Sequence, residues 1–194
     1  MIYRAAPDSG MSRFWLDEIC EAAVLYHKEA GREGTPITVA AGMTPSAPIH
    51  FGIVREAALA SFAAEALKRR GYAVRFIYYW DDFDHFCKMP YFASSSAARR
   101  AISEQFGRPL TRVQDFYGVY DSYASHIMRD FEAVLRRLSI APEFNYQSAM
   151  YAGGAYTPYI IAALEKRRKI WRILYGAREC PPVSADSFYP VEIY

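Results

Sequence analysis

Residues 37–79 read ITVAAGMTPSAPIHFGIVREAALASFAAEALKRRGYAVRFIYY, and they contain the pattern from which the fold is predicted. A β-type run at 37–41 leads into a proline-containing turn, and an alanine-rich helix is predicted from about 52 to 70. Gly71 ends that helix, and the run 74–79 predicts a second strand. Because parallel strands need a long crossover connection, this order predicts a βαβ unit with two parallel strands.

Outside this unit the sequence is mostly helical. Apolar residues recur at helical spacing in four further segments, 14–30, 97–106, 119–138 and 157–175. Thr157 is predicted as the N-cap of the last helix and Pro158 as its first residue. Residues 142–146 predict a third short strand. The expected fold class is therefore α/β, with a short parallel sheet of three strands flanked by helices.

Composition narrows the class of protein. The chain has 194 residues, 52% hydrophobic and 23% charged, which suits one domain with a core and excludes a disordered chain. Its net charge of +2 does not by itself indicate a nucleic-acid-binding protein. Cys20, Cys87 and Cys180 form no CxxC pair, which argues against a disulfide framework or a zinc site and favours a reducing cytoplasm. No metal site and no membrane segment are expected.

The chain is expected to divide into three parts. Residues 1–13 look like a leader, 14–180 form the α/β half-domain with a helical insertion, and 181–194 form a tail that is either an ordered loop or a truncated end.

The turn at 41–52, AGMTPSAPIHFG, carries the strongest functional signal. It follows a parallel strand and runs into a helix N-terminus, where unpaired N–H groups and the helix dipole favour anions such as phosphate. It is neither a P-loop nor a GxGxxG fingerprint. His50 can donate hydrogen bonds to phosphate oxygens, and Gly52 leaves room for a flat base. The alternative is a proline-rich turn whose histidine only caps the helix.

Several motifs, in order, resemble class I lysyl-tRNA synthetases. GMTPSAPIHFGIVRE at 42–56 resembles the family's G-x-T-P-S-G-x-x-H-x-G-N-x-R-E, a version of the HIGH signature. WDDFD at 80–84, followed by Lys88-Met89-Pro90, resembles S-W-D-D-x-D…K-x-P. Further matches are GRPL at 107–110, DFYG at 115–118, DSYASH at 121–126, and MY…GAY at 150–156. The ordered set spans about 14–190 and implies a Rossmann nucleotide-binding half-domain of the HIGH type.

The resemblance also implies an activity and site residues. It implies lysine–tRNA ligase chemistry: ATP and lysine form lysyl-adenylate, which is transferred to tRNA. His50 would be the catalytic residue, stabilising charge at the α-phosphorus without a protein nucleophile. The implied ATP-binding residues are Thr44, Pro45, Ser46, His50 and Gly52. The implied amino-acid-binding residues are Gly42, Thr44, Trp80, Asp81, Asp82 and Asp84.

The three acids after the second strand have two further interpretations. They suit a lysine ammonium or a Mg²⁺ ion that arrives with ATP, because burying Asp81, Asp82 and Asp84 unpaired would be costly. The alternative is a solvated turn. The basic residues of the last helix, 166–169 and Arg172, likewise suit either the phosphates of a tRNA acceptor stem or an ordinary solvated face.

The sequence departs from the family pattern in three respects. Ala47 replaces a glycine, which would strain the backbone if that position needs a positive φ. Ile53 replaces an asparagine and can donate no hydrogen bond. No K-M-S-K-S-like segment or anticodon-binding region is found in the sequence, so the first strand is expected at an open sheet edge. The chain is then a fragment, or a second chain or dimer mate completes the sheet.

These departures leave other functions open. One is a non-catalytic paralogue that binds an amino acid or a nucleotide. Another is an amino-acid-activating enzyme that does not act on tRNA.

Overall fold

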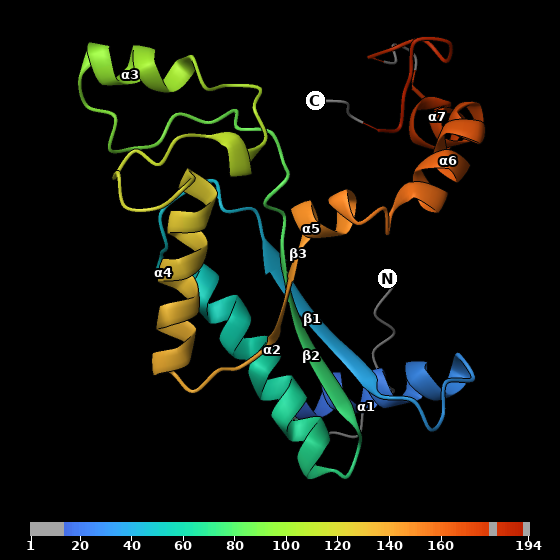
Figure 1. Ribbon diagram of the computed structural model, residues 1–194. Helices are drawn as coiled ribbons and strands as arrows, with labels where there is room; N and C mark the ends of the chain where they lie inside the picture. Colours follow the sequence, from blue (N-terminus) through green and yellow to red (C-terminus); the bar gives the residue numbers. More distant parts are fainter. Residues whose placement is uncertain (1–13, 179–181, 192–194) are drawn as a thin grey trace. The chain divides into compact units, whose positions relative to one another are not determined.

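The computed structural model describes residues 14–178 and 182–191. The expected leader, 1–13, lies outside the described residues, as do 179–181, which include Cys180, and 192–194. The elements, in chain order, are α1 (Trp15–Glu29), β1 (Ile37–Met43), α2 (Phe51–Arg69), β2 (Val74–Trp80), α3 (Ser96–Ser103), the 3-10 turn η1 (Leu110–Arg112), α4 (Tyr123–Arg137), β3 (Glu143–Tyr146), α5 (Gln147–Ala152), α6 (Thr157–Glu165) and α7 (Arg167–Tyr175) (Figure 1). Within the described ranges, no helix has both the length and the apolar character needed to cross a bilayer.

The three strands form one parallel sheet. Their order is β1-β2-β3, so β2 is central and β1 lies at an edge (Figure 1). β2 has the sequence VRFIYYW, whose β-branched and aromatic side chains suit a central strand. Along β1 more buried and more exposed residues alternate, the pattern of a strand covered on one face. The predicted α/β class, the three-strand sheet and the edge position of the first strand are confirmed.

Packing divides the chain into two compact units. The described parts of the first unit are 14–42, 50–78 and 133–144. In this unit α1 packs against α2, and Cys20, Ile37 and Leu67 form a buried core. Small alanines at the interface let the two helices approach closely, and the Cys20 thiol lies 3.9 Å from the carbonyl oxygen of Ala63. This core attaches both helices to the first half of β1.

The described parts of the second unit are 43–49, 79–132, 145–178 and 182–191. Its core is aromatic. The fully buried Trp80 ring meets Phe131 edge-on, with ring centroids 5.3 Å apart. Tyr123 contacts Phe86 at 5.9 Å and Phe116 at 5.1 Å. Such pairs add to the burial energy of the rings, so the loops after β2 are fixed by aromatic packing rather than by regular structure.

Helix α4 begins at Tyr123, four residues later than the periodicity predicts. The buried Asp115 carboxylate accepts hydrogen bonds from the N–H groups of Tyr117, Val119 and Tyr120 at 3.1, 2.8 and 2.9 Å. Those bonds hold residues 115–120 in a turn. The helix starts only where the Ser122 hydroxyl accepts from the Ser125 N–H, at 3.1 Å.

The predicted helix at 157–175 is two helices. α6 ends at Glu165 and α7 begins at Arg167, and Lys166 is both the C-cap of α6 and the N-cap of α7. Thr157 is the first helical residue and Tyr156 the N-cap, so the predicted cap was one residue too late. The six-residue α5, which follows β3 directly, was not predicted.

Candidate functional site

The three acids after β2 differ in their surroundings. Asp82 is 2% exposed, and it accepts hydrogen bonds from the N–H of Ser148 at 2.8 Å and from its hydroxyl at 2.5 Å. These contacts satisfy the buried carboxylate and hold the first turn of α5 beside the end of β2. Asp82 therefore holds the end of β2 and the start of α5 together at the site.

Asp84 and Asp81 connect to the turn that follows β1. The Thr44 hydroxyl donates to Asp84 Oδ2 at 2.8 Å. The N–H of Asp81 donates to the carbonyl oxygen of Met43 at 3.0 Å. Residues 43–49 and 79–84 thus form one hydrogen-bonded corner, and the structure brings together Thr44, Asp81 and Asp84, which the sequence assigned to the amino-acid site.

The Asp81 carboxyl group is electrostatically unfavourable as a carboxylate. Burial raises its pKa, and the nearby negative charges of Asp84 and Asp82 raise it further. None of the ion pairs among the described residues involves Asp81 or Asp84. A cation placed between these two side chains would relieve the repulsion, so this corner is suited to a positively charged ligand.

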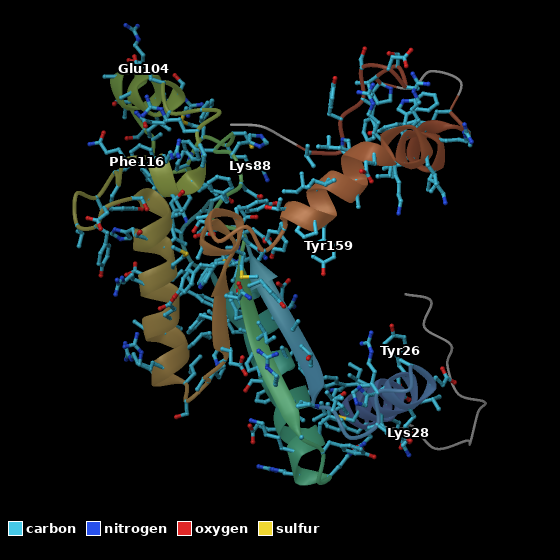
Figure 2. All side chains as sticks on the ribbon, turned by 45° about the vertical axis from the view of Figure 1, so that its right-hand side comes forward. Tyr26, Lys28, Lys88, Glu104, Phe116 and Tyr159 are labelled. Atoms are coloured by element: carbon cyan, nitrogen blue, oxygen red, sulfur yellow. The ribbon has the colours of Figure 1, made fainter. Side chains whose placement is uncertain are left out.

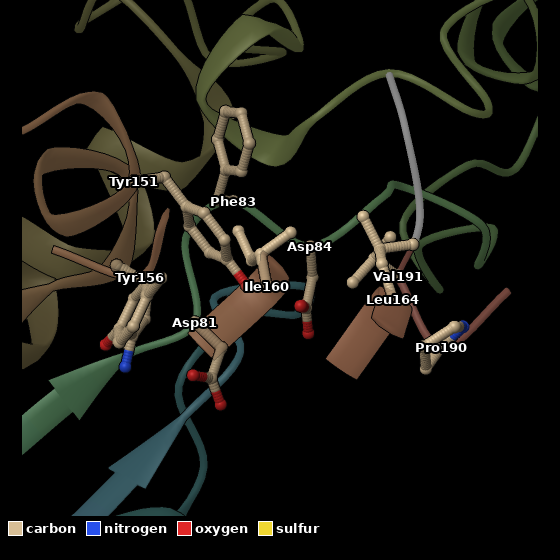
Figure 3. Close-up of a pocket in the computed structure, with 10 residues that line it drawn as sticks. Asp81, Phe83, Asp84, Tyr151, Tyr156, Ile160, Leu164, Pro190 and Val191 are labelled. Atoms are coloured by element: carbon tan, nitrogen blue, oxygen red, sulfur yellow. The ribbon is translucent and has the colours of Figure 1, made fainter. Parts of the chain in front are cut away.

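Asp81 and Asp84 line a cavity of about 740 Å³ within the second unit. Figure 3 shows both carboxylates on the same side of the loop after β2, with Phe83 pointing the other way. The other lining residues are Phe83, Gln147, Tyr151, Tyr156, Ile160, Leu164, Pro190 and Val191. The cavity is large enough for an amino acid, and it combines an acidic corner with mainly apolar and aromatic walls.

The aromatic wall comes from α5 and the turn after it. The Tyr151 ring lies 5.2 Å from Phe83 and 4.9 Å from Tyr156, measured between centroids. The Tyr156 hydroxyl donates to the side-chain oxygen of Gln147. Tyr151 and Tyr156 belong to the motif at 150–156, but nothing in that motif by itself predicts that they line the site. Aromatic faces beside carboxylates suit a ligand with an aliphatic stem and a cationic end.

Besides Asp82, two residues predicted to bind ligand are buried in the second unit. Trp80 is fully buried against Phe131, and Pro45 is among the fully buried side chains. Ser46 is half-buried, and its N–H donates to the carbonyl oxygen of Thr44 at 2.8 Å, closing the turn. These three residues shape the corner that presents Thr44.

The first unit contains the other predicted site residues. His50 is the N-cap of α2 and is exposed, yet its side chain makes no capping hydrogen bond. The imidazole therefore makes no capping hydrogen bond, and its contact with phosphate stays a prediction. The first turn of α2 contains no acid that would compete for its N–H groups. Gly42 is exposed near the end of β1.

The backbone accommodates the alanine that replaces the family's glycine at position 47. Among the described non-glycine residues only Ser139 has a positive φ, so alanine at position 47 causes no backbone strain. Gly52 has a specific steric role instead, because a Cβ there would lie 3.1 Å from both Cε1 and Nδ1 of His50. The imidazole therefore folds back over Gly52.

We expect Gly52→Ala to displace the exposed His50 ring from its present position, because the added methyl group would lie only 3.1 Å from two of its atoms. Alanine favours a helix more than glycine, so thermal stability should stay unchanged or rise. The measurement is ATP affinity together with thermal unfolding, with Ala60→Gly in mid-helix as the control for helix propensity. Unchanged ATP affinity with a lower melting temperature would contradict this role.

Comparisons with known proteins agree with the fold and with the order of motifs. The family model described as tRNA synthetases class I (K) matches residues 13–194. The lysine–tRNA ligase of Pyrococcus horikoshii is 36% identical over 183 residues, covering 93% of this chain and 33% of that protein. Those of Treponema pallidum and Thermococcus kodakarensis are 31% and 36% identical, covering 94% and 93% of this chain.

The chain spans about a third of the length of these curated relatives. The match runs through both units and includes the turn after β1, the acidic loop after β2 and the aromatic motif of α5. On this evidence the chain belongs to the class I tRNA synthetases of the lysine (K) family.

Proposed function

We propose that this chain carries the lysine subsite and part of the ATP site of a class I lysine–tRNA ligase, which forms lysyl-adenylate and transfers lysine to tRNA. The observation that supports this most is the pair of carboxylates, Asp81 and Asp84, at one corner of a cavity with aromatic walls. The names of the relatives, which are lysine–tRNA ligases, agree with the charge of that corner.

In this proposal Asp81 and Asp84 bind the ammonium group of the lysine side chain. Asp84 is oriented by the Thr44 hydroxyl, so its second oxygen stays available to the ligand. Burial, followed by the negative charges of Asp84 and Asp82, raises the pKa of Asp81, and a bound ammonium would offset the repulsion between these acids. At about 4 Å a charge pair near a protein surface is worth up to about 4 kcal/mol before desolvation. The aliphatic stem of lysine would lie against the aromatic wall.

Asp82 and Trp80 are positioning residues in this account rather than ligands of lysine. Asp82 uses both oxygens on Ser148, and Trp80 is fully buried. Together they fix where the Asp81–Asp84 loop leaves β2. Gly42, near the end of β1, is the remaining residue that we predict to bind the amino acid.

The ATP side of the proposal rests on the HIGH-type signature and on the N-terminus of α2. The exposed His50 imidazole and an acid-free first turn are suited to phosphate oxygens. ATP, arriving with Mg²⁺, would supply the α-phosphorus that the lysine carboxylate attacks, and pyrophosphate would leave as the bond between the α-phosphorus and the bridging oxygen breaks. His50 would hold the phosphate charge, Gly52 would keep the imidazole in place, and Thr44, Pro45 and Ser46 would form the turn beside it.

We also propose that the edge strand β1 pairs with a further strand. Its outer edge has no strand beside it among the described residues. An open edge readily accepts a further strand, which would come from more of the same protein, from a second chain or from a dimer mate.

Isothermal titration calorimetry with lysine and with norleucine tests the amino-acid subsite. Norleucine has the same stem without the ε-ammonium, so we expect it to bind roughly 10–100-fold more weakly, since a charge-assisted hydrogen bond contributes about 1.5–3 kcal/mol. Equal affinity for the two ligands would contradict an acidic recognition corner, and binding of neither would remove the subsite from this chain.

A further inference from the structure

The cavity in the second unit offers no cation to a ligand's carboxylate. Of the ten described residues that line it, none is lysine, arginine or histidine, whereas Asp81 and Asp84 contribute two carboxylates. An amino acid whose ε-ammonium lies at these acids therefore brings its own carboxylate into a negatively charged site. Like charges repel as strongly as opposite charges attract at the same separation, so the ligand's carboxylate needs a hydrogen-bond donor away from the acids.

Gln147 is the lining residue with donors to spare. A carboxamide has one acceptor oxygen and two N–H donors. The Tyr156 hydroxyl donates to Gln147 Oε1, so the oxygen is occupied and the amide plane is oriented. Among the described residues, none accepts a hydrogen bond from Gln147 Nε2. The Tyr151 hydroxyl can donate or accept, but the amide NH₂ group can only donate, so Gln147 is the group that selects an anion.

The backbone of Gln147 is fixed relative to the two acids. Gln147 begins α5 directly after β3, and the N–H and hydroxyl of the next residue, Ser148, both donate to the Asp82 carboxylate. Asp82 lies between Asp81 and Asp84 in the loop after β2. The buried Asp82 therefore connects the amide to the acid pair. Fixed charges at one place and a fixed donor at another suit a ligand that carries both kinds of group.

We propose that Gln147 donates a hydrogen bond to the α-carboxylate of the amino acid, and that it makes the cavity select lysine over the corresponding diamine. Tyr156 is a positioning residue, because it orients the carboxamide. A neutral donor suits this role, since a cation here would itself pair with Asp81 or Asp84 in place of the ligand. One N–H binds one carboxylate oxygen and leaves the other free to react. The inference rests on the proposed function.

Calorimetry of the full chain with lysine and with cadaverine tests the proposal. Cadaverine is lysine without its carboxylate, so the ratio of the two affinities isolates the contribution of that group. The unchanged chain should bind lysine about tenfold more tightly than cadaverine, because a hydrogen bond to a charged group has an effect of this size. Equal affinities, or tighter binding of cadaverine, would overturn the proposal.

Gln147→Glu should reverse that preference. The variant keeps the size of the side chain and the oxygen that accepts from Tyr156, but it replaces the NH₂ group with negative charge. Lysine should bind about tenfold or more weakly than it binds the unchanged chain, and cadaverine at least as tightly.

Gln105→Glu is the matched control for this substitution. The Gln105 oxygen also accepts from a side chain, that of Arg108 at 3.1 Å, and Gln105 does not line the cavity. The control should leave the ratio of lysine to cadaverine affinity as it is in the unchanged chain. An unchanged ratio in Gln147→Glu, or the same change in both variants, would contradict the proposal.

Tyr156→Phe tests the positioning role. It removes the hydroxyl that orients the carboxamide and keeps the ring that contacts Tyr151. The affinity for lysine should fall severalfold, because the carboxamide can then rotate, whereas the affinity for cadaverine should not change. Tyr159→Phe is the control, since Tyr159 extends from α6 with 73% of its surface exposed (Figure 2) and should affect neither ligand. Equal losses for both ligands in Tyr156→Phe would overturn its positioning role.

The ratios also separate this inference from misfolding and from the proposed function. A misfolded fraction lowers the number of binding sites but leaves the ratio of affinities in the folded molecules unchanged. The preference for lysine over norleucine depends on the ε-ammonium, so it should survive in Gln147→Glu. If it survives and the ratio of lysine to cadaverine affinity does not change, Gln147 has no role and the acidic corner stands. If the unchanged chain does not bind lysine, both proposals fail.

Discussion

Asp81→Asn is expected to weaken lysine binding by about tenfold or more, and Asp81→Asn/Asp84→Asn to abolish most of it. The single variant removes one of the two charges that face the ligand in the cavity while keeping the size of the side chain. Calorimetry with lysine measures the effect. Asp121→Asn, which changes an exposed acid outside the cavity, is the matched control and should bind lysine as the unchanged chain does.

The thermal stability of Asp81→Asn should rise at neutral pH, whereas its affinity for lysine should fall. Because the folded-state pKa of Asp81 is raised, the folded chain holds this proton more tightly than the unfolded chain does. Stability contributed by this group is therefore lost as the pH rises through that pKa, and at neutral pH Asp81→Asn should raise the melting temperature slightly. A variant that loses both lysine binding and stability would show that Asp81 is a structural residue rather than a ligand of lysine.

The same shift predicts how lysine binding depends on pH. Lysine keeps its side-chain ammonium charge throughout the acid range, so the affinity follows the charge of the carboxylates. As the pH falls, affinity should decline at a higher pH than an ordinary aspartate would give, because the pKa of Asp81 is raised. In Asp81→Asn this part of the pH dependence should disappear.

Asp115→Asn is expected to lower the free energy of unfolding by about 2–3 kcal/mol at neutral pH. Asp115 is 4% exposed, and its carboxylate accepts three backbone N–H bonds and one from His126 Nδ1 at 3.1 Å. Asparagine can accept at one atom only and brings an NH₂ group that faces these donors. Urea unfolding measures the loss, and Asp121→Asn, exposed in the next turn, should stay within about 0.5 kcal/mol.

At low pH the folding stability that the Asp115 carboxylate contributes should be lost. Burial raises the pKa of this carboxyl group, but the hydrogen bonds from Tyr120, Val119, Tyr117 and His126 outweigh burial and lower the pKa to about 2. A depressed pKa contributes stability above the ordinary value near 4 and loses it as the pH falls toward about 2. The difference between the unchanged chain and Asp115→Asn should shrink over this range. A constant difference down to pH ~2 would contradict the assignment.

The sequence predicts the sheet well because the signals that form it are local. The β-branched and aromatic run of β2 and the alanine-rich α2 are recognisable in short windows, and the crossover through α2 predicts that β1 and β2 are parallel. His50 at the start of α2 is likewise a local feature, set by the turn before it.

Contacts between distant residues are what the sequence does not reveal. Nothing near Asp82 indicates that Ser148, 66 residues away, will satisfy its carboxylate. The late start of α4 has the same kind of cause, since Asp115 competes with the helix for backbone N–H groups. The cavity is also assembled from separate segments, and its wall at Pro190 and Val191 comes from the far end of the chain.

A crystal structure of the chain grown with lysine would show directly whether Asp81 and Asp84 recognise the ligand. We expect the ε-ammonium within salt-bridge distance, about 4 Å, of a carboxylate oxygen of Asp81 or Asp84, with the stem beside Tyr151. Lysine ordered elsewhere on the chain, or bound in this cavity with its ε-ammonium directed away from both acids, would contradict it.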